Sequence, residues 1–246
     1  MPTILITGAA SGLGEAFLNV LISDSSNKIF TLDRLSLPAS QLPIGRVTHQ
    51  GLDVTSESDL ATWYSTHLKD KALDLVVHCA GIRGLVPEVE RNHPDNVAAC
   101  ETMLVMDSAT MRRAFDINAL GTFNLFRIIL PSLTLAAQKN PERPPKVITM
   151  TSRMGSLTAN VGGGAYAYRA SKAALNAIVK SFSVDIPEVV WILIHPGRVE
   201  TKLVKCKEEG AISAEESIEA LMKLIPSFGQ ENSGKFYDRF GVEIPW

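Results

Sequence analysis

The stretch TILITGAASGLG, residues 3–14, decides the fold. It opens on a short apolar run, residues 3–7, which we interpret as a buried strand. Three glycines follow at positions 8, 12 and 14, and from position 13 onward apolar residues recur at helical spacing. A strand, a glycine-rich turn and a helix in this order are typical of a unit that binds a dinucleotide.

Each glycine of this turn has a physical role if a dinucleotide binds there. Gly8 takes the tight turn, Gly12 lets a pyrophosphate approach the backbone, and Gly14 lets the helix pack closely on the strand. The helix N-terminus, around Ser11 and Leu13, then offers free N–H groups to the phosphates. The lysine of a P-loop is absent, which disfavours that class of site. The alternative is a glycine-rich turn that holds no ligand.

An acidic residue ends the second expected strand, residues 28–33. Asp33 follows the turn by about twenty residues, where a carboxylate can accept hydrogen bonds from the adenosine ribose and would repel a 2′-phosphate. The cofactor prediction is therefore NAD(H). Arg34 keeps NADP(H) open as an alternative, because its guanidinium is well suited to a phosphate. Without a ligand, Asp33 would be an ordinary cap at the end of a strand.

Short apolar runs alternate with helical patterns along nearly the whole chain. Such alternation predicts an α/β fold: a doubly wound, mostly parallel sheet with helices on both faces, in a single Rossmann-type domain over residues 1–246. We expect further strands at 46–53, 73–81, 147–152, 189–197 and 234–240, and helices after Thr55 or Ser56, near 111–130, over 168–183 and after the capping box at 213–216. The stretch 83–110 is long for a connection and reads as a partly helical, functional insertion.

Composition excludes several classes of partner. Of 246 residues, 46% are hydrophobic and 20% charged, the formal net charge is -2, and there is no dense basic run, so neither nucleic acid nor a membrane surface is an expected partner. No uncharged apolar run reaches the ~18 residues of a membrane span, and the start has no secretory pattern. Three widely spaced cysteines fit a reducing, cytoplasmic location, and five histidines without ligand spacing predict no metal site.

Tyr168 and Lys172 lie four residues apart, which puts both on one face of a helix. A nearby cation favours the phenolate and should lower the pKa of Tyr168, making it a usable general acid or base. Ser152, at the end of an expected strand, could hydrogen-bond a substrate carbonyl oxygen. The plain alternatives are a half-buried tyrosine, a solvated lysine and a capping serine.

Taken together, these motifs resemble the short-chain dehydrogenase/reductase superfamily over nearly the whole length. The resemblance rests on TGAASGLG (7–14), Asp53-Val54, Ala80-Gly81, Asn118, Ser152, YRASK (168–172), and Pro196-Gly197 followed by Val199 and Thr201. YRASKAALN (168–176) and the ending SGKF…IPW (233–246) are most similar to the branch of C-factor and sniffer-like carbonyl reductases.

This resemblance implies an NAD(P)-dependent oxidoreductase that interconverts a small-molecule carbonyl compound and an alcohol. Tyr168 would exchange the proton with the substrate oxygen, Lys172 would bind the nicotinamide ribose and tune Tyr168, and Ser152 would orient the carbonyl. It also implies roles for residues around the cofactor: a relay water held by Asn118, adenine contacts of Asp53 and Val54, cofactor contacts of Ala80, Gly81 and Val199, and a carboxamide contact of Thr201. Two other functions stay open: a dinucleotide-binding sensor or scaffold without turnover, and a lyase or isomerase on the same fold.

Three features depart from the family pattern or extend it. His78-Cys79 stands where the family usually has two asparagines, the 83–110 insertion is long, and residues 161–164 lengthen the spacing between Ser152 and Tyr168. We expect both inserted segments to shape the pocket mouth. The resemblance also implies a homodimer or homotetramer paired through the helices near 111–130 and 168–183. The first of these carries an unusual number of apolar residues: Phe115, Phe123, Leu125, Phe126, Ile128, Ile129 and Leu130.

Overall fold

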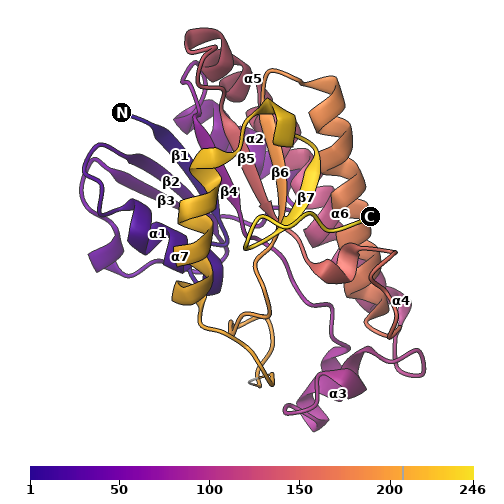
Figure 1. Ribbon diagram of the computed structural model, residues 1–246. Helices are drawn as coiled ribbons and strands as arrows, with labels where there is room; N and C mark the ends of the chain where they lie inside the picture. The colour runs from indigo at the N-terminus through magenta and orange to yellow at the C-terminus, as the bar shows by residue number, and fades with distance from the viewer. Residues whose placement is uncertain (207) are drawn as a thin grey trace.

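One seven-stranded parallel sheet runs through the computed structural model, which describes residues 1–206 and 208–246 (Figure 1). The strands lie in the order β3-β2-β1-β4-β5-β6-β7, and each neighbouring pair is parallel. Their bounds are β1 (Thr3–Thr7), β2 (Lys28–Asp33), β3 (Val47–Gly51), β4 (Leu75–His78), β5 (Lys146–Met150), β6 (Val190–His195) and β7 (Lys235–Asp238). The strand order reverses between β1 and β4, and open α/β sheets bind ligands at the carboxyl side of such a reversal.

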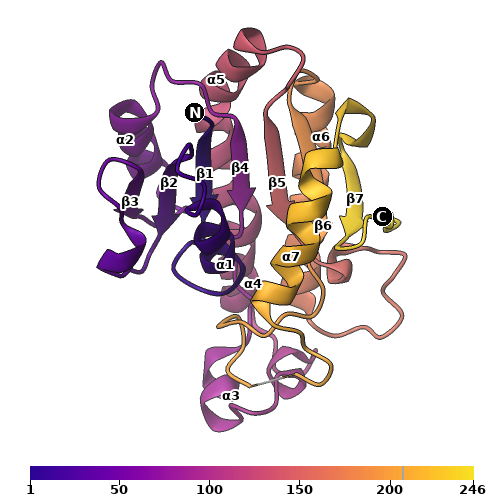
Figure 2. The same ribbon diagram turned by 60° about the vertical axis from the view of Figure 1, so that its left-hand side comes forward.

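Helices cover both faces of the sheet, which confirms the predicted doubly wound α/β fold (Figure 2). On one face lie α1 (Gly12–Leu21) and α7 (Ala214–Leu224), which contact each other. On the other lie α2 (Glu57–His67), α4 (Ser108–Phe115), α5 (Gly121–Lys139) and α6 (Tyr166–Asp185). The sheet is therefore the middle layer of three.

Six of the seven strands supply side chains to both of two separate cores, whereas β3 supplies only Val47, to one of them. In β1, Ile4 and Ile6 pack with α1 and α7, whereas Leu5 packs with the helices of the opposite face. In β6, Ile192 belongs to the first core and Trp191 to the second. Successive side chains of a strand point to opposite faces, so a strand buried on both sides is apolar throughout. This explains why the strands appeared in the sequence as continuous apolar runs.

The helix expected near 111–130 is longer than predicted and is interrupted. It begins at Ser108, because the Asp107 side chain accepts a hydrogen bond from the N–H of Thr110, and α5 continues to Lys139. A π-helical turn, Asp116–Leu120, separates α4 from α5. Within the described chain the stretch Ser108–Lys139 is long and apolar enough to match a membrane span, but 56% of its most apolar window is buried inside the protein, as in a core helix.

The insertion 83–110 is partly helical, as predicted. It contains α3 (Pro87–Asn92) and a 3-10 turn, Ala98–Glu101, and it projects beyond the carboxyl edge of the sheet (Figure 1). Strands β3 and β4 end earlier than expected, at Gly51 and His78. The residues that follow these two strands are therefore loop residues at the same edge.

A buried histidine joins two strands and a helix at the centre of the fold. The Thr7 hydroxyl lies 2.8 Å from Nδ1 of His78, and Nε2 of His78 lies 2.8 Å from the Thr122 hydroxyl. Thr7 also accepts the N–H of Ala80, and Thr122 donates to the carbonyl of Asn118. Because the Thr122 hydroxyl donates to Asn118, Nε2–H of His78 must donate to Thr122, and in the neutral ring Nδ1 then accepts from the Thr7 hydroxyl. Burial, with a smaller contribution from the Lys172 charge, lowers the pKa of His78 to about 3.

This histidine should make stability depend on pH. Between the ordinary pKa of 6.5 and the folded pKa of about 3, His78 is protonated in the unfolded chain and neutral in the folded protein. The free energy of unfolding therefore falls as the pH drops through this window. The contribution is about 1.4 kcal/mol per pH unit, or roughly 2 kcal/mol between pH 6.5 and 5. Urea unfolding at about pH 7 and about pH 5 should show this loss in the wild type and a correspondingly smaller one in His78→Asn. The exposed His93 supplies the matched control, His93→Asn, and equal pH dependence in wild type and His78→Asn would refute the assignment.

Candidate active site

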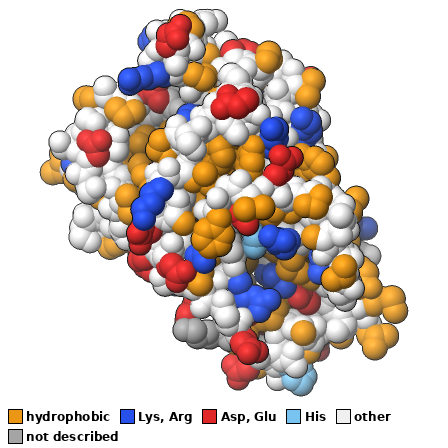
Figure 3. All heavy atoms as spheres, in the orientation of Figure 1, with side chains coloured by type: hydrophobic (Ala, Val, Ile, Leu, Met, Phe, Trp, Pro, Cys, Tyr) orange, Lys and Arg blue, Asp and Glu red, His pale blue; other side chains and the backbone are white. Residues whose placement is uncertain are grey.

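A cavity of about 670 Å³ opens at the carboxyl edge of the sheet, lined by the loops that follow the strands β1 to β6. Its volume lies within the range of ~300–1,000 Å³ typical of ligand pockets. Figure 3 shows the molecule hollowed below its centre, with Lys and Arg side chains gathered around the hollow. The structure brings almost every predicted site residue to this cavity: Gly8, Ser11, Gly12, Leu13, Gly14, Asp33, Arg34, Asp53, Val54, Ala80, Gly81, Ser152, Tyr168, Lys172, Val199 and Thr201.

The glycine-rich turn forms a cradle that side chains would fill. A Cβ atom on Gly14 would lie 2.1 Å from the carbonyl oxygen of Gly8, and one on Gly12 would lie 2.9 Å from the Thr201 side chain. Gly8 and Gly12 also have positive φ angles, +68° and +54°. At the start of α1, the Ser11 side chain makes no capping hydrogen bond to any described residue. The N-terminus of α1 therefore faces the cavity with bare backbone, which fits a pyrophosphate.

The charged residues after β2 and β3 form a small network of their own. The Asp33 carboxylate accepts hydrogen bonds from the N–H of Ala10, at 2.9 Å, and from the N–H of Leu35, at 2.9 Å. Arg34 lies 3.6 Å from the Asp53 carboxylate, and both side chains are substantially exposed. Asp33 therefore braces the glycine-rich turn, while Arg34 is turned towards Asp53.

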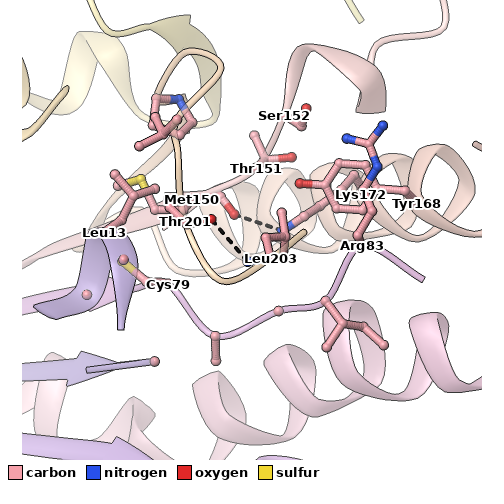
Figure 4. A pocket seen from close by; sticks show the side chains of 18 of the residues that line it. Leu13, Cys79, Arg83, Met150, Thr151, Ser152, Tyr168, Lys172, Thr201 and Leu203 are labelled. Carbon is pink, nitrogen blue, oxygen red and sulfur yellow. Dashed lines mark hydrogen bonds between the residues drawn. The ribbon is translucent and has the colours of Figure 1, made fainter. Parts of the chain in front are cut away.

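Tyr168 and Lys172 lie one turn apart on α6, and both are buried against the cavity (Figure 4). The Lys172 ammonium donates to the Met150 carbonyl at 3.0 Å and lies 5.8 Å from the centre of the Tyr168 ring. Burial lowers the pKa of Lys172 to about 8. Ser152 follows β5, and its hydroxyl accepts the N–H of Met154 at 3.2 Å. The sequence-based prediction that these three side chains share one site agrees with this geometry.

The expected electrostatics of Tyr168 need a correction. We predicted that Lys172 would lower its pKa, but burial raises the pKa of Tyr168, and the strongest opposing influence is the Arg83 guanidinium, followed by hydrogen bonding to Ser152. The reason is geometric, because the Lys172 ammonium is engaged by a backbone carbonyl, whereas Arg83 lies over the face of the Tyr168 ring, 4.8 Å from its centre. Sequence reasoning missed Arg83, although its place two residues after Gly81, in the loop that follows β4, is a positional signal.

Asn118 lies outside the cavity lining, in the π-helical turn. Its side-chain amide donates to the carbonyl of Ile82 at 2.9 Å and to the Ser171 hydroxyl at 3.0 Å, and its oxygen accepts the N–H of Ile82 at 2.8 Å. The side chain thus clamps the loop that carries Gly81 and Arg83, a role different from the implied hold on a relay water. A Cβ on Gly81 would lie 3.0 Å from the Asn118 oxygen, so a side chain there would require this clamp to shift by a few tenths of an ångström.

The three departures from the family pattern take different places. His78 is a core residue, and Cys79 lines the cavity as a neutral thiol, because burial raises its pKa to about 12. In the glycine-rich segment 161–164 the first three residues are exposed and Gly164 is half-buried, and the segment contacts the cavity-lining Arg169, whose Nε donates to the carbonyl of Gly163. Residue 83 of the insertion lines the cavity directly. Among the described residues, no cluster of His, Cys, Asp or Glu could hold a metal ion.

Comparison with known proteins shows the family to which this chain belongs. The model of the short chain dehydrogenase family matches residues 2–211. The chain is 37% identical to C-signal of Myxococcus xanthus over 185 residues, 74% of this chain and 98% of that protein. It is 32% identical to 1-hydroxy-2-glutathionyl-2-methyl-3-butene dehydrogenase of Rhodococcus sp. over the full length of both.

Solved structures with the same fold include carbonyl reductases. The carbonyl reductase Sniffer of D. melanogaster covers the whole chain with a TM-score of 0.85 and 25% identity. An NADPH-bound carbonyl reductase from chicken fatty liver is 24% identical with a TM-score of 0.83, covers 100% of this chain and 94% of its own, and shows the shared fold. The predicted resemblance to the C-factor and sniffer-like branch is thus confirmed. The chain belongs to the short-chain dehydrogenase/reductase family, and it is an NAD(P)-dependent oxidoreductase of that family.

Proposed function

We propose that the protein interconverts a carbonyl compound and an alcohol, with Tyr168 as the general acid and base. The observation that carries the proposal is the convergence of Tyr168, Ser152 and Lys172 in one buried corner of the cavity that also holds the glycine-rich turn. The relatives agree in reaction class, since the Rhodococcus protein is named a dehydrogenase of a hydroxy compound and the fly protein a carbonyl reductase. Neither name sets the direction of the reaction in this chain.

In this proposal the bound nicotinamide dinucleotide supplies or accepts the hydride. The backbone of the glycine-rich turn and the start of α1 hold the pyrophosphate, and Asp53 and Val54 lie where the adenine end would rest. Val199 and Thr201 line the cavity where the nicotinamide end of the cofactor would lie. The Tyr168 hydroxyl gives its proton to the substrate oxygen during reduction and takes it back during oxidation.

Ser152 and Lys172 support that proton transfer. The Ser152 hydroxyl hydrogen-bonds the substrate oxygen and keeps it in line with Tyr168. Lys172, with a pKa of about 8, holds a positive charge below that pH, next to the place where negative charge develops. Because the site is buried, these charges act in a medium of low dielectric constant and are stronger than in water.

We expect Tyr168→Phe to keep the fold and the affinity for the cofactor while turnover falls ~10²–10⁴-fold, because the ring still packs but the proton donor is gone. The measurement is kcat for the best substrate from a panel of ketones, aldehydes and alcohols, with cofactor affinity taken from fluorescence titration. Tyr166→Phe is the matched control, since that hydroxyl lies outside the cavity lining, and it should leave turnover unchanged. Near-normal turnover in Tyr168→Phe would rule out the assignment, and cofactor binding without any turnover in the wild type would favour a sensor or scaffold.

We further propose that NAD(H) is preferred over NADP(H). The Asp33 carboxylate is held at the edge of the cavity by the N–H groups of Ala10 and Leu35, where it would repel a 2′-phosphate. Arg34, the residue that could attract such a phosphate, is turned towards Asp53. The shared fold with the NADPH-bound chicken enzyme does not favour either cofactor, so the argument depends on these local contacts alone.

The cofactor preference can be tested with two variants of Asp33. We expect the wild type to have the higher kcat/KM with NADH, and Asp33→Asn to narrow the ratio by about tenfold, since it removes the charge and keeps an oxygen for the N–H of Ala10. Asp33→Ala should lose both the charge and the brace, and therefore lower kcat/KM with NADH as well. A tenfold or greater wild-type preference for NADPH would show that Arg34 sets the choice.

A homodimer or homotetramer is the assembly that we propose. Of the apolar residues counted from the sequence, Leu125, Phe126 and Ile129 turn out to fill the subunit's own core, while Ile128 and Leu130 are partly buried. What remains is an exposed apolar surface on the α4–α5 side: Phe115, Leu120 and Phe123 are 37%, 53% and 40% exposed, respectively. Tyr166, on the neighbouring α6, is also exposed. Apolar residues clustered on a surface often mark an interface.

We expect light scattering at micromolar concentration to give the mass of a dimer or tetramer, and Phe123→Glu to shift it towards the monomer, because a buried charge opposes association. Ile44→Glu is the matched control, since Ile44 is fully exposed and far from α4 and α5 in the chain, and it should leave the mass unchanged. A monomeric wild type would refute the proposal.

The proposed setting is the cytoplasm, with a small-molecule carbonyl or alcohol as the partner and neither nucleic acid nor a membrane. The three cysteines are free, which suits a reducing compartment. The cavity is of small-molecule size, and the net charge of -2 offers no general attraction to polyanions.

A further inference from the structure

A buried ion pair lies directly behind the active-site tyrosine. Arg83 donates from Nε and Nη2 to the two carboxylate oxygens of Glu101, at 2.9 and 2.8 Å. The two side chains are only 12% and 11% exposed. A two-point contact between a guanidinium and a carboxylate fixes both side chains in one orientation.

This pair also connects the insertion to the helix that carries Tyr168. Arg83 lies at the start of the insertion and Glu101 ends its 3-10 turn, so the pair closes the loop between them. The backbone carbonyl of Glu101 accepts the N–H of Ala165, the residue before α6, which has a left-handed backbone with φ of +48°. The turn that starts α6 and the guanidinium over the Tyr168 ring are thus positioned by the same residue.

We propose that Arg83 and Glu101 are a positioning pair that sets how readily Tyr168 releases and takes up its proton. The inference rests on the proposed role of Tyr168 as acid and base, and it assigns a function to the insertion. The guanidinium carbon of Arg83 lies 4.8 Å from the centre of the Tyr168 ring, closer than the Lys172 ammonium at 5.8 Å. At that distance, in a buried site, a cation favours the phenolate over the phenol.

The charges around Tyr168 come from three segments. The cation Arg83 and the anion Glu101 belong to the insertion, the cation Lys172 lies on α6, and the anion Glu208 lies on the loop after β6. Burial raises the pKa of Tyr168, Arg83 opposes this rise, and Glu101 and Glu208 add to it. Arg83 and Glu101 therefore act on the tyrosine with opposite signs while they stabilise each other.

Because Arg83 and Glu101 affect the pKa of Tyr168 in opposite directions, their variants can be distinguished from a general structural defect. Removing the cation in Arg83→Met should raise the pKa of Tyr168, whereas removing the anion in Glu101→Gln should lower it. At a fixed pH near the midpoint, the ratio of tyrosinate to tyrosine should change by about threefold or more in each direction. A general loss of packing would move both variants the same way.

The titration can be read without turnover. The chain contains four tyrosines, so labelling with ¹³Cζ-tyrosine gives few resonances, and the one missing from Tyr168→Phe is that of Tyr168. The titration is recorded with and without NAD⁺. The pH profile of kcat/KM is the second readout, and its limb assigned to Tyr168 should move in the same direction as the resonance in each variant.

Two further variants keep the test decisive. Arg83→Lys retains the charge and should shift the titration less than Arg83→Met, and Arg127→Met removes an arginine from the exposed pair with Glu57 and should not shift it at all. If Arg83→Met does not fold, the nearly isosteric Glu101→Gln decides alone, through its downward shift. Shifts of the same sign in both variants, or no shift in Glu101→Gln, would overturn the inference.

The outcomes also separate this inference from the proposed function. Opposite shifts of the Tyr168 resonance in a protein that turns over no carbonyl or alcohol would support the pair and refute the reaction. Turnover that depends on Tyr168 but has the same pH profile in wild type, Arg83→Met and Glu101→Gln would support the reaction and refute the pair.

Discussion

The close approach of Gly8 and Gly14 is the constraint on which the rest of the site depends. A side chain on Gly14 would collide with the Gly8 carbonyl, and one on Gly8 would lie 2.9 Å from the backbone of Ala80. Because nothing stands between these backbones, α1 can begin directly against β1 and β4, where the strand order reverses. The bare helix N-terminus at the edge of the cavity depends on that contact.

Around this backbone frame the protein buries an unusual set of polar and charged groups. Lys172 is held by the Met150 carbonyl, Asn118 is clamped to the backbone of Ile82, and Arg83 is paired with Glu101. Each group is satisfied by a partner, which is what makes its burial tolerable. In such surroundings a charge a few ångströms away has a large effect on a titrating phenol, so the proton affinity of Tyr168 depends on the whole network.

Much of the architecture could be predicted from the sequence because its causes are local. Strands β1 and β2 have the expected bounds, since apolar runs buried on both faces differ sharply from the turns that flank them. Nearly all predicted site residues line the cavity, because the carboxyl ends of parallel strands must meet at one edge. The four-residue spacing of Tyr168 and Lys172 places both on one face of α6, as it does on any helix.

The remaining features were decided by tertiary structure. No local sequence pattern predicts that Arg83 pairs with Glu101, that Lys172 donates to Met150, or that Asn118 donates to Ile82. Each of these contacts joins residues that are distant in the sequence and meet only in the folded structure. The direction of the Tyr168 pKa shift depends on burial and on those contacts, so the spacing alone gave the wrong sign. The sequence by itself determined the fold, the edge where the site lies and the residue types present there; tertiary packing determined which charge meets the tyrosine, because electrostatic effects depend on distance and burial rather than on order along the chain.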